Sequence, residues 1–338
     1  MSIGLDIGSK TIKLVELSFD GGRNILKSAG VVGFAGTSVE NAQDDKSYAT
    51  LVDAIKKLIH DTKVSSREVD IAIPESQSFT RVIKFPLLSD PEIASAVKWE
   101  AEQYIPIPIS EAIIQHEIVE RREKTSPPEV LVLLVAAPRA LVEKYVNVTG
   151  QAGLTAGAVE TSLIALTRSL APANQTSVLV DMGARTTSMA LAKNGQLVFS
   201  RTIPTAGAAF TRAVGQALGV PEAQADSYKM TYGLSTKQLE GKVAAAINPV
   251  FTLITEEIKK AIHYYQTELQ GEMPTSVILA GGSAGLPNLV SNLTKAIGIE
   301  VVIGNPFAKV VVDPTTTKKL AAYSPLYSIA TGLALRRD

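Results

Sequence analysis

Residues 5–13 read LDIGSKTIK, and residues 179–189 read LVDMGARTTSM. In each stretch an apolar strand ends in Asp-x-Gly, and small or hydroxyl-bearing residues lead into a second apolar strand. This pattern predicts a β-hairpin whose tip exposes backbone N–H groups that can bind phosphate. The Asp at the base of each hairpin can face a hydrated divalent cation. A single Asp-x-Gly is usually an ordinary turn, but two of them favour two related lobes that close on one nucleotide.

A third segment supports the nucleotide interpretation. Residues 277–289 read VILAGGSAGLPNL, which predicts a buried strand, a glycine-rich turn and the start of a helix. Adjacent glycines allow the backbone to approach a flat ligand closely, and a helix N-terminus favours negative charge. The alternative is a plain strand-to-helix connection, which the two hairpins make less attractive.

These three segments together resemble the actin-like ATPase superfamily. Within it, residues 95–108, SAVKWEAEQYIPIP, look like the W-E-A-E-x-Y-I-P signature of the PilM family of type IV pilus assembly proteins. Residues 225–229, 304–307 and 330–336 also resemble that family, in the expected order, so the resemblance runs from residue 3 to residue 336. It implies an α/β protein with the actin-like (ribonuclease H-like) two-lobed ATPase fold and an inserted subdomain of the FtsA/PilM type.

The resemblance also implies which residues would bind the phosphates and the metal. Lys13 would reach the β- or γ-phosphate as a point charge; its alternative is a solvated strand residue. Asp6 and Asp181 would hold Mg²⁺ through water. The two phosphate-binding tips would consist of Gly8, Ser9, Lys10 and Thr11 in the first hairpin and Gly183, Ala184, Arg185, Thr186 and Thr187 in the second.

Further positions are implied for the base, the ribose and the water. Glu257 and Lys260 resemble positions that contact ribose and adenine, although a charge pair at this spacing is also typical of a solvated helix face. Glu160 would position a water, or serve as a helix-start carboxylate. Gly207 stands where the family often has paired glycines, which leaves close backbone approach there open. The residues expected beside the base are Gly281, Gly282, Ser283 and Asn288.

The pattern of strands and helices predicts the domain organisation. We expect the first actin-like lobe at 1–80, completed by 158–177 and 322–338, and the second lobe at 178–206 and 256–321. The inserted subdomain is expected at 81–157, as helix, strand, strand and helix, and a small upper subdomain of the second lobe at 207–255. The single Trp, Trp99, lies in a predicted helix from Glu92 to Tyr104. It is expected to anchor the core of the insertion; alternatively, this subdomain and the first lobe form a groove that captures a peptide.

Composition excludes several classes of function. Lys plus Arg and Asp plus Glu number 33 each, so no net positive charge attracts nucleic acid. The chain has no Cys, and its three His lie far apart, which argues against a zinc site. The longest apolar runs, such as 130–138, are about half the length that crosses a bilayer. With no signal-peptide pattern at the N-terminus, we expect a cytoplasmic protein without direct membrane insertion.

The function that the resemblance implies is an ATP-binding scaffold of the type IV pilus assembly platform, peripheral to the inner membrane. We expect ATP and Mg²⁺ as ligands, with weak or no hydrolysis, and the N-terminal peptide of the inner-membrane protein PilN and other platform components as partners. A sugar kinase would need an Asp base facing an acceptor hydroxyl, and no motif supplies one. An FtsA-like division protein would end in an amphipathic membrane helix, whereas residues 335–338 directly follow the last predicted core helix.

Overall fold

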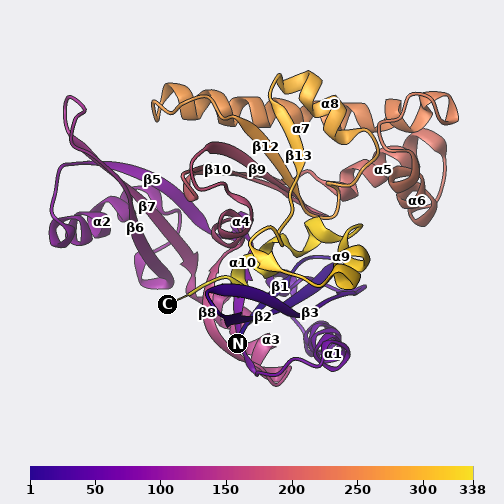
Figure 1. The fold of residues 1–338 in the computed structure, drawn as a ribbon, viewed down its shortest axis with the longest axis horizontal. Coiled ribbons are helices and arrows are strands. Elements are labelled where there is room, and N and C mark those ends of the chain that lie inside the picture. The colour runs from indigo at the N-terminus through magenta and orange to yellow at the C-terminus, as the bar shows by residue number, and fades with distance from the viewer. Residues whose placement is uncertain (338) are drawn as a thin grey trace.

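The computed structural model describes residues 1–337. Asp338, the last residue of the expected return segment, lies outside the described residues. Two lobes, each built on its own sheet, stack one above the other in Figure 1, and a smaller three-stranded sheet stands to one side. The elements near the C-terminus include a short helix, α9 (Pro314–Leu320), and a 3₁₀ turn, η5 (Ser324–Tyr327).

The first lobe contains a six-stranded sheet in the order β14-β3-β2-β1-β4-β8. The strands β1, β2 and β3 form an antiparallel meander. Because β4 and β8 run parallel to β1, the carboxyl ends of these three strands meet at one edge of the sheet. The strands are β1 (Ser2–Ile7), β2 (Thr11–Asp20), β3 (Arg23–Gly33), β4 (Glu68–Ile73), β8 (Thr155–Thr161) and β14 (Val310–Val311).

Helices cover both faces of this sheet. On one side are α1 (Asp45–Thr62) and α3 (Arg139–Gln151), and on the other are α4 (Ser162–Leu170) and α10 (Ser328–Ala334). Gly4 of β1 lets α10 lie directly on the sheet, because a Cβ at that position would collide with the backbone oxygen of Ala330. The helix α10 therefore packs directly against β1, the strand whose carboxyl end carries Asp6.

The second lobe contains a five-stranded sheet in the order β11-β10-β9-β12-β13. Its longest helix, α7 (Lys242–Thr267), packs a stripe of apolar side chains against the sheet and runs continuously across the expected subdomain boundary at residue 255. The other elements are β9 (Thr176–Met182), β10 (Thr187–Lys193), β11 (Gln196–Ile203), β12 (Ser276–Ala280), β13 (Glu300–Ile303), α5 (Gly207–Leu218), α6 (Glu222–Tyr232) and α8 (Leu289–Ile297).

The third sheet, in the order β5-β7-β6, forms the inserted subdomain. Its strands are β5 (Phe79–Pro86), β6 (Ala112–Arg122) and β7 (Glu129–Pro138), and the helix α2 (Asp90–Tyr104) covers one face. Ser89 and Glu92 form a capping box at the start of α2. Ile93 and Val97 on α2 pack against alternate residues of β7, which leaves the opposite face of the sheet turned toward the first lobe.

Two expectations about this subdomain are wrong. The helix α3 was expected in the insertion, but Leu141, Tyr145 and Val148 share the core of the first lobe because this face of α3 is apolar and lies on α1 and β8. We therefore propose that the insertion spans about 79–138. Trp99 was expected in the core, but it is 74% exposed, since the buried positions of α2 are those of Ile93, Val97 and Ala101.

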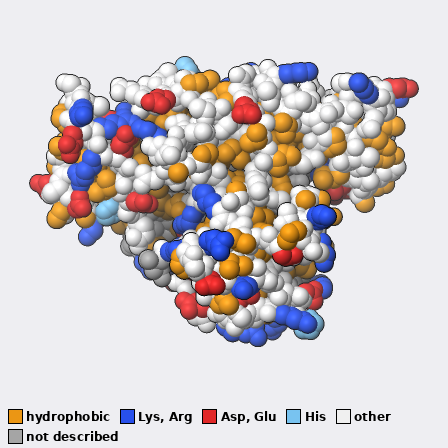
Figure 2. Space-filling view, in the orientation of Figure 1, with side chains coloured by type: hydrophobic (Ala, Val, Ile, Leu, Met, Phe, Trp, Pro, Cys, Tyr) orange, Lys and Arg blue, Asp and Glu red, His pale blue; other side chains and the backbone are white. Residues whose placement is uncertain are grey.

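Surface charge and hydropathy agree with the composition. Figure 2 shows Lys, Arg, Asp and Glu side chains interspersed over this face, with apolar side chains gathered where the two lobes meet. Among residues 1–337, no helix is long and apolar enough to span a bilayer.

Candidate functional site

Both Asp-x-Gly stretches form the hairpins that the sequence predicts, and the two hairpins have the same geometry. In the first, the backbone N–H of Gly8 donates to the oxygen of Thr11 across 3.1 Å. In the second, the N–H of Gly183 donates to the oxygen of Thr186, also across 3.1 Å. The strand registers match as well, with Asp6 opposite Lys13 and Asp181 opposite Ser188.

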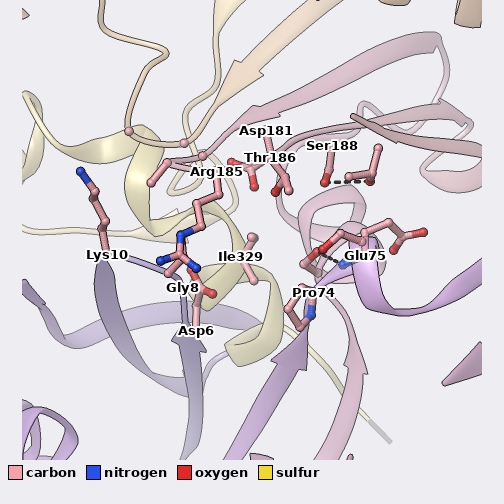
Figure 3. A pocket seen from close by; sticks show the side chains of 18 of the residues that line it. Asp6, Gly8, Lys10, Pro74, Glu75, Asp181, Arg185, Thr186, Ser188 and Ile329 are labelled. Atoms are coloured by element: carbon pink, nitrogen blue, oxygen red, sulfur yellow. Dashed lines mark hydrogen bonds between the residues drawn. The ribbon is translucent and has the colours of Figure 1, made fainter. Parts of the chain in front are cut away.

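The two tips lie on opposite sides of a cavity of about 850 Å³ between the lobes, a size that suits a nucleotide. Figure 3 shows Arg185 extending from the second lobe toward Gly8 of the first tip. Most of the candidate residues line this cleft: Asp6, Gly8, Ser9, Lys10, Thr11, Lys13, Asp181, Gly183, Ala184, Arg185, Thr186, Gly207, Gly281, Gly282 and Ser283.

Lys13 is buried in the cleft, so its interpretation as a solvated strand residue is wrong. Its Nζ lies 2.8 Å from Oδ2 of Asp6, directly across the hairpin, and the lysine is only 8% exposed. A buried ion pair of this kind is costly to break, because the remaining charge would be left without a partner. Its contact with a phosphate stays a prediction.

Asp181 has no cation opposite it on its own hairpin. Burial raises its pKa to about 6, the charge of Lys13 lowers it and the charge of Asp6 raises it. This pKa lies below neutral pH, so the carboxyl is mostly ionised at pH 7, as the predicted Mg²⁺ site requires. Gly281 lies against this carboxyl with a φ of +83°, and a Cβ there would collide with Oδ1 of Asp181. The glycine-rich turn thus closes the cleft behind Asp181.

The start of α5 rests on the second tip. The N–H groups of Gly207 and Ala208 donate to the backbone oxygens of Gly183 and Ala184 across 3.1 and 2.8 Å. A Cβ on Gly207 would lie 2.8 Å from Oγ of Ser283. A single glycine therefore lets the start of α5 approach the second tip closely, and close backbone approach to a phosphate stays a prediction.

The charged residues Lys229 and Asp226 line the cleft although neither was among the candidates. Lys229 is buried and donates to Asp226 Oδ1 at 2.6 Å and to Thr211 Oγ1 at 2.9 Å. Thr211 Oγ1 also donates to Asp226 Oδ1, at 2.8 Å. Burial raises the pKa of Asp226, but the hydrogen bonds from Lys229 and Thr211 lower it below its usual value. Lys229 and Asp226 lie in the stretch 225–229, which resembled the family but carried no assigned role, so the motif itself was the available signal.

Five candidate residues do not line the cleft. Glu160 forms two hydrogen bonds with Arg168, at 2.6 and 2.7 Å, and lies on a different cavity, so the structure does not place it to position a water. Glu257 pairs with Arg201 and Lys260 on the face of α7, where the Lys260 side chain is 64% exposed. The remaining two are Thr187, which donates to the Thr205 oxygen, and Asn288, which starts α8 with a φ of +61°.

The carboxyl of Glu75 also lines the cleft, and it was not a candidate. It follows Pro74 at the carboxyl end of β4, the strand beside β1, and is 6% exposed. Burial raises its pKa, and the nearby hydroxyls of Thr80, Ser200 and Thr161 lower it. A Glu directly after a Pro is a weak signal in the sequence, because such a position is usually a solvated turn.

A second cavity, of about 240 Å³, lies between the insertion and the first lobe. Leu133, Val135 and Ala137, on the face of β7 that α2 leaves uncovered, line one side. Val159 of the edge strand β8 and Ile164 of α4 line the other. We call this cavity the groove.

With both sites described, comparison with known proteins identifies the family. A family described as type IV pilus assembly protein PilM matches residues 4–338. The chain belongs to the PilM family. A solved structure described as a PilM-PilN type IV pilus biogenesis complex is similar over 99% of this chain and 98% of that chain, with 27% identity and a TM-score of 0.84.

More distant relatives share the superfamily. The cell division protein FtsA of Streptococcus pneumoniae is 20% identical over 90% of this chain and 75% of that protein. MreB5 of Spiroplasma citri, solved bound to AMPPNP, is 14% identical with a TM-score of 0.53 over 98% of this chain and 93% of that one. The prediction of an actin-like fold in the PilM family is therefore confirmed, and FtsA is related at the level of the superfamily.

Proposed function

We propose that this chain is a cytoplasmic ATP-binding scaffold of the type IV pilus assembly platform, and that it is held at the inner membrane by PilN. The groove is the observation that carries this proposal, because it lies where an insertion-to-lobe peptide site is expected. The similar PilM-PilN complex supports PilN as the partner. Other platform components would bind surfaces that we leave unassigned.

The groove suits a short extended peptide with apolar side chains. Its walls are mostly aliphatic, and β8 is the edge strand of the six-stranded sheet. An edge strand offers backbone groups for pairing with an added strand, while pockets beside it select side chains. The N-terminal peptide of PilN is our proposed ligand, with Val135 of β7 contacting its apolar residues.

We propose ATP with Mg²⁺ as the ligand of the cleft. Asp6 and Asp181 would hold the metal through water, and Lys13 and the two hairpin tips would hold the phosphates. Bound Mg²⁺ would neutralise phosphate charge at this point. Because Arg168 holds Glu160 away from the cleft, the arrangement supports weak or no hydrolysis.

Calorimetric titration with a synthetic peptide of the PilN N-terminus tests this function. We expect micromolar or tighter binding to the unmodified chain. Val135→Arg should weaken it at least tenfold, because a charged side chain would fill the apolar groove. Val146→Arg is the matched control, since Val146 is on the exposed face of α3 and lines neither cavity. Absence of binding, or equal loss in both variants, would contradict the proposal.

A further inference from the structure

The cleft and the groove share a thin wall at the carboxyl ends of β4 and β8. Ile73, the last residue of β4, lines both cavities. On β8 and α4, Thr161 lines the groove and the next residue, Ser162, lines the cleft. The backbone N–H of Glu75 donates to Ser162 Oγ at 3.3 Å, which joins the two strand ends. A shift of this wall would therefore change both sites at once.

The Glu75 carboxyl lies where three parts of the molecule meet. Around it are hydroxyls of Thr161 from the first lobe, Thr80 from the insertion and Ser200 from the second lobe. Ser200 Oγ in turn donates to the backbone oxygen of Thr80 at 3.3 Å. Figure 3 shows the Glu75 side chain turned away from Asp6 and Gly8, so it does not belong to the phosphate-binding tips.

Three buried polar atoms at this junction are unsatisfied. Glu75 Oε2, Thr80 Oγ1 and Thr161 Oγ1 have no hydrogen-bond partner with good geometry among residues 1–337. Buried polar atoms are nearly always paired in a stable conformation, and unpaired ones mark a place where a small rearrangement is favourable. The junction is therefore poised for a shift that brings its hydroxyls onto the carboxyl.

We propose that Glu75 couples the two sites, so that nucleotide in the cleft strengthens peptide binding in the groove; this rests on the proposed function. A nucleotide held by both hairpins draws the second lobe toward the first, and β11 packs against the 3₁₀ turn η2 (Glu75–Gln77) and against β5. Closure presses Ser200 and Thr80 onto the Glu75 carboxyl. The carboxyl then binds Thr161, which orders the groove wall for the peptide.

The test is the ratio of peptide dissociation constants measured without and with ATP·Mg²⁺. In the unmodified chain we expect ATP to tighten peptide binding about fivefold or more, and the peptide to tighten ATP binding by the same factor, because coupling is reciprocal. Glu75→Gln keeps the shape but replaces one acceptor oxygen of the side chain with a donor amide, and should reduce the ratio to less than about twofold. A purely structural role would change the affinities and leave the ratio intact.

Ser200→Ala removes the second-lobe hydroxyl and should also reduce the ratio, which keeps the test valid if Glu75→Gln folds poorly. Glu143→Gln, at an exposed position of α3 that lines neither cavity, should keep the unmodified ratio. Peptide binding with a ratio near one in the unmodified chain, or a full ratio in both variants, overturns the coupling while leaving the proposed function intact. Failure of the peptide to bind at all overturns both.

Discussion

The two phosphate hairpins share one backbone and differ in their charge. Asp6 faces Lys13 across its hairpin, and the two form a buried ion pair at 2.8 Å. Asp181 faces Ser188, whose hydroxyl accepts a hydrogen bond from Thr202 at 3.0 Å. Because no cation lies opposite Asp181 on its hairpin, the effect of burial dominates and raises the pKa of Asp181 to about 6. The same fold thus places a buried ion pair on one side of the cleft and a carboxyl with a raised pKa on the other.

The tips also differ in what they contact across the cleft. Lys10 and Arg185 occupy equivalent positions, and each reaches the opposite lobe. Lys10 lies 3.8 Å from Glu222 of α6, and Arg185 lies 3.4 Å from Ser38 Oγ. Lys10 and Glu222 are largely exposed, so their pair contributes little to stability. The contrast that matters energetically is the buried one between Asp6 and Asp181.

Replacement of Asp6 should have the largest effect on this contrast. Asp6→Asn leaves the ammonium of Lys13 buried without its closest carboxylate, which typically costs about 3–5 kcal/mol. We expect the free energy of unfolding, measured with urea at pH 7.5 without nucleotide, to fall by at least about 3 kcal/mol. A fall below about 1 kcal/mol would mean that Asp181 replaces Asp6 as the partner of Lys13.

Replacement of Asp181 should have the opposite sign. The raised pKa means that the folded state binds a proton more tightly than the unfolded chain, so ionisation of Asp181 destabilises the protein as pH rises from about 4 to 6. Asp181→Asn removes this cost, and should raise the free energy of unfolding at pH 7.5 by up to about 3 kcal/mol. The gain should disappear near pH 4. Urea unfolding from pH 4 to 8 measures it, and a loss of stability at pH 7.5 would contradict the assignment.

The smallest predicted effect concerns nucleotide affinity. Lys13→Ala should weaken ATP binding roughly ten- to hundredfold, because it removes a charge-assisted hydrogen bond worth about 1.5–3 kcal/mol. Ser188→Ala, at the equivalent position of the second hairpin, should change affinity by less than about threefold, since a hydroxyl contributes less than a charge. Calorimetric titration with ATP·Mg²⁺ checks both variants, and circular dichroism confirms that they fold. Similar losses in the two would remove the electrostatic distinction between the hairpins.

Local sequence pattern was enough to predict the hairpins. An apolar strand, Asp-x-Gly and a second apolar strand determine where the chain turns and which side chains stand at the base, because these are interactions among near neighbours. The sequence also predicted a tight turn at Gly281. The physical requirement for glycine there is its close contact with Asp181, which comes from a distant part of the chain. The helix predicted from Glu92 to Tyr104 is present as α2.

Side-chain partners from other elements decided what sequence reasoning missed. Glu160 lies where the chain re-enters the first lobe, as expected. Its carboxylate, however, accepts a hydrogen bond from Arg168 on the following helix and lines the groove instead of the cleft. Trp99 has a large apolar side chain of the kind usually found in a core, yet Ile93 and Val97 form the face of α2 that packs against the sheet. Lys229 reaches Thr211 because α6 packs on α5, and the family-like stretch 225–229 marked this lysine without revealing that contact.

The sequence by itself determined the superfamily, the two hairpins, the glycine-rich turn and those residues of the cleft that these three segments supply. These depend on short-range geometry, in which the order of residues dictates the backbone. Only the tertiary structure decided the ionisation of Asp181, the pairing of Lys13, the direction of Glu160 and the place of Glu75. Each of these depends on burial and on charges that folding brings together from distant segments, and neither quantity can be read from neighbouring residues.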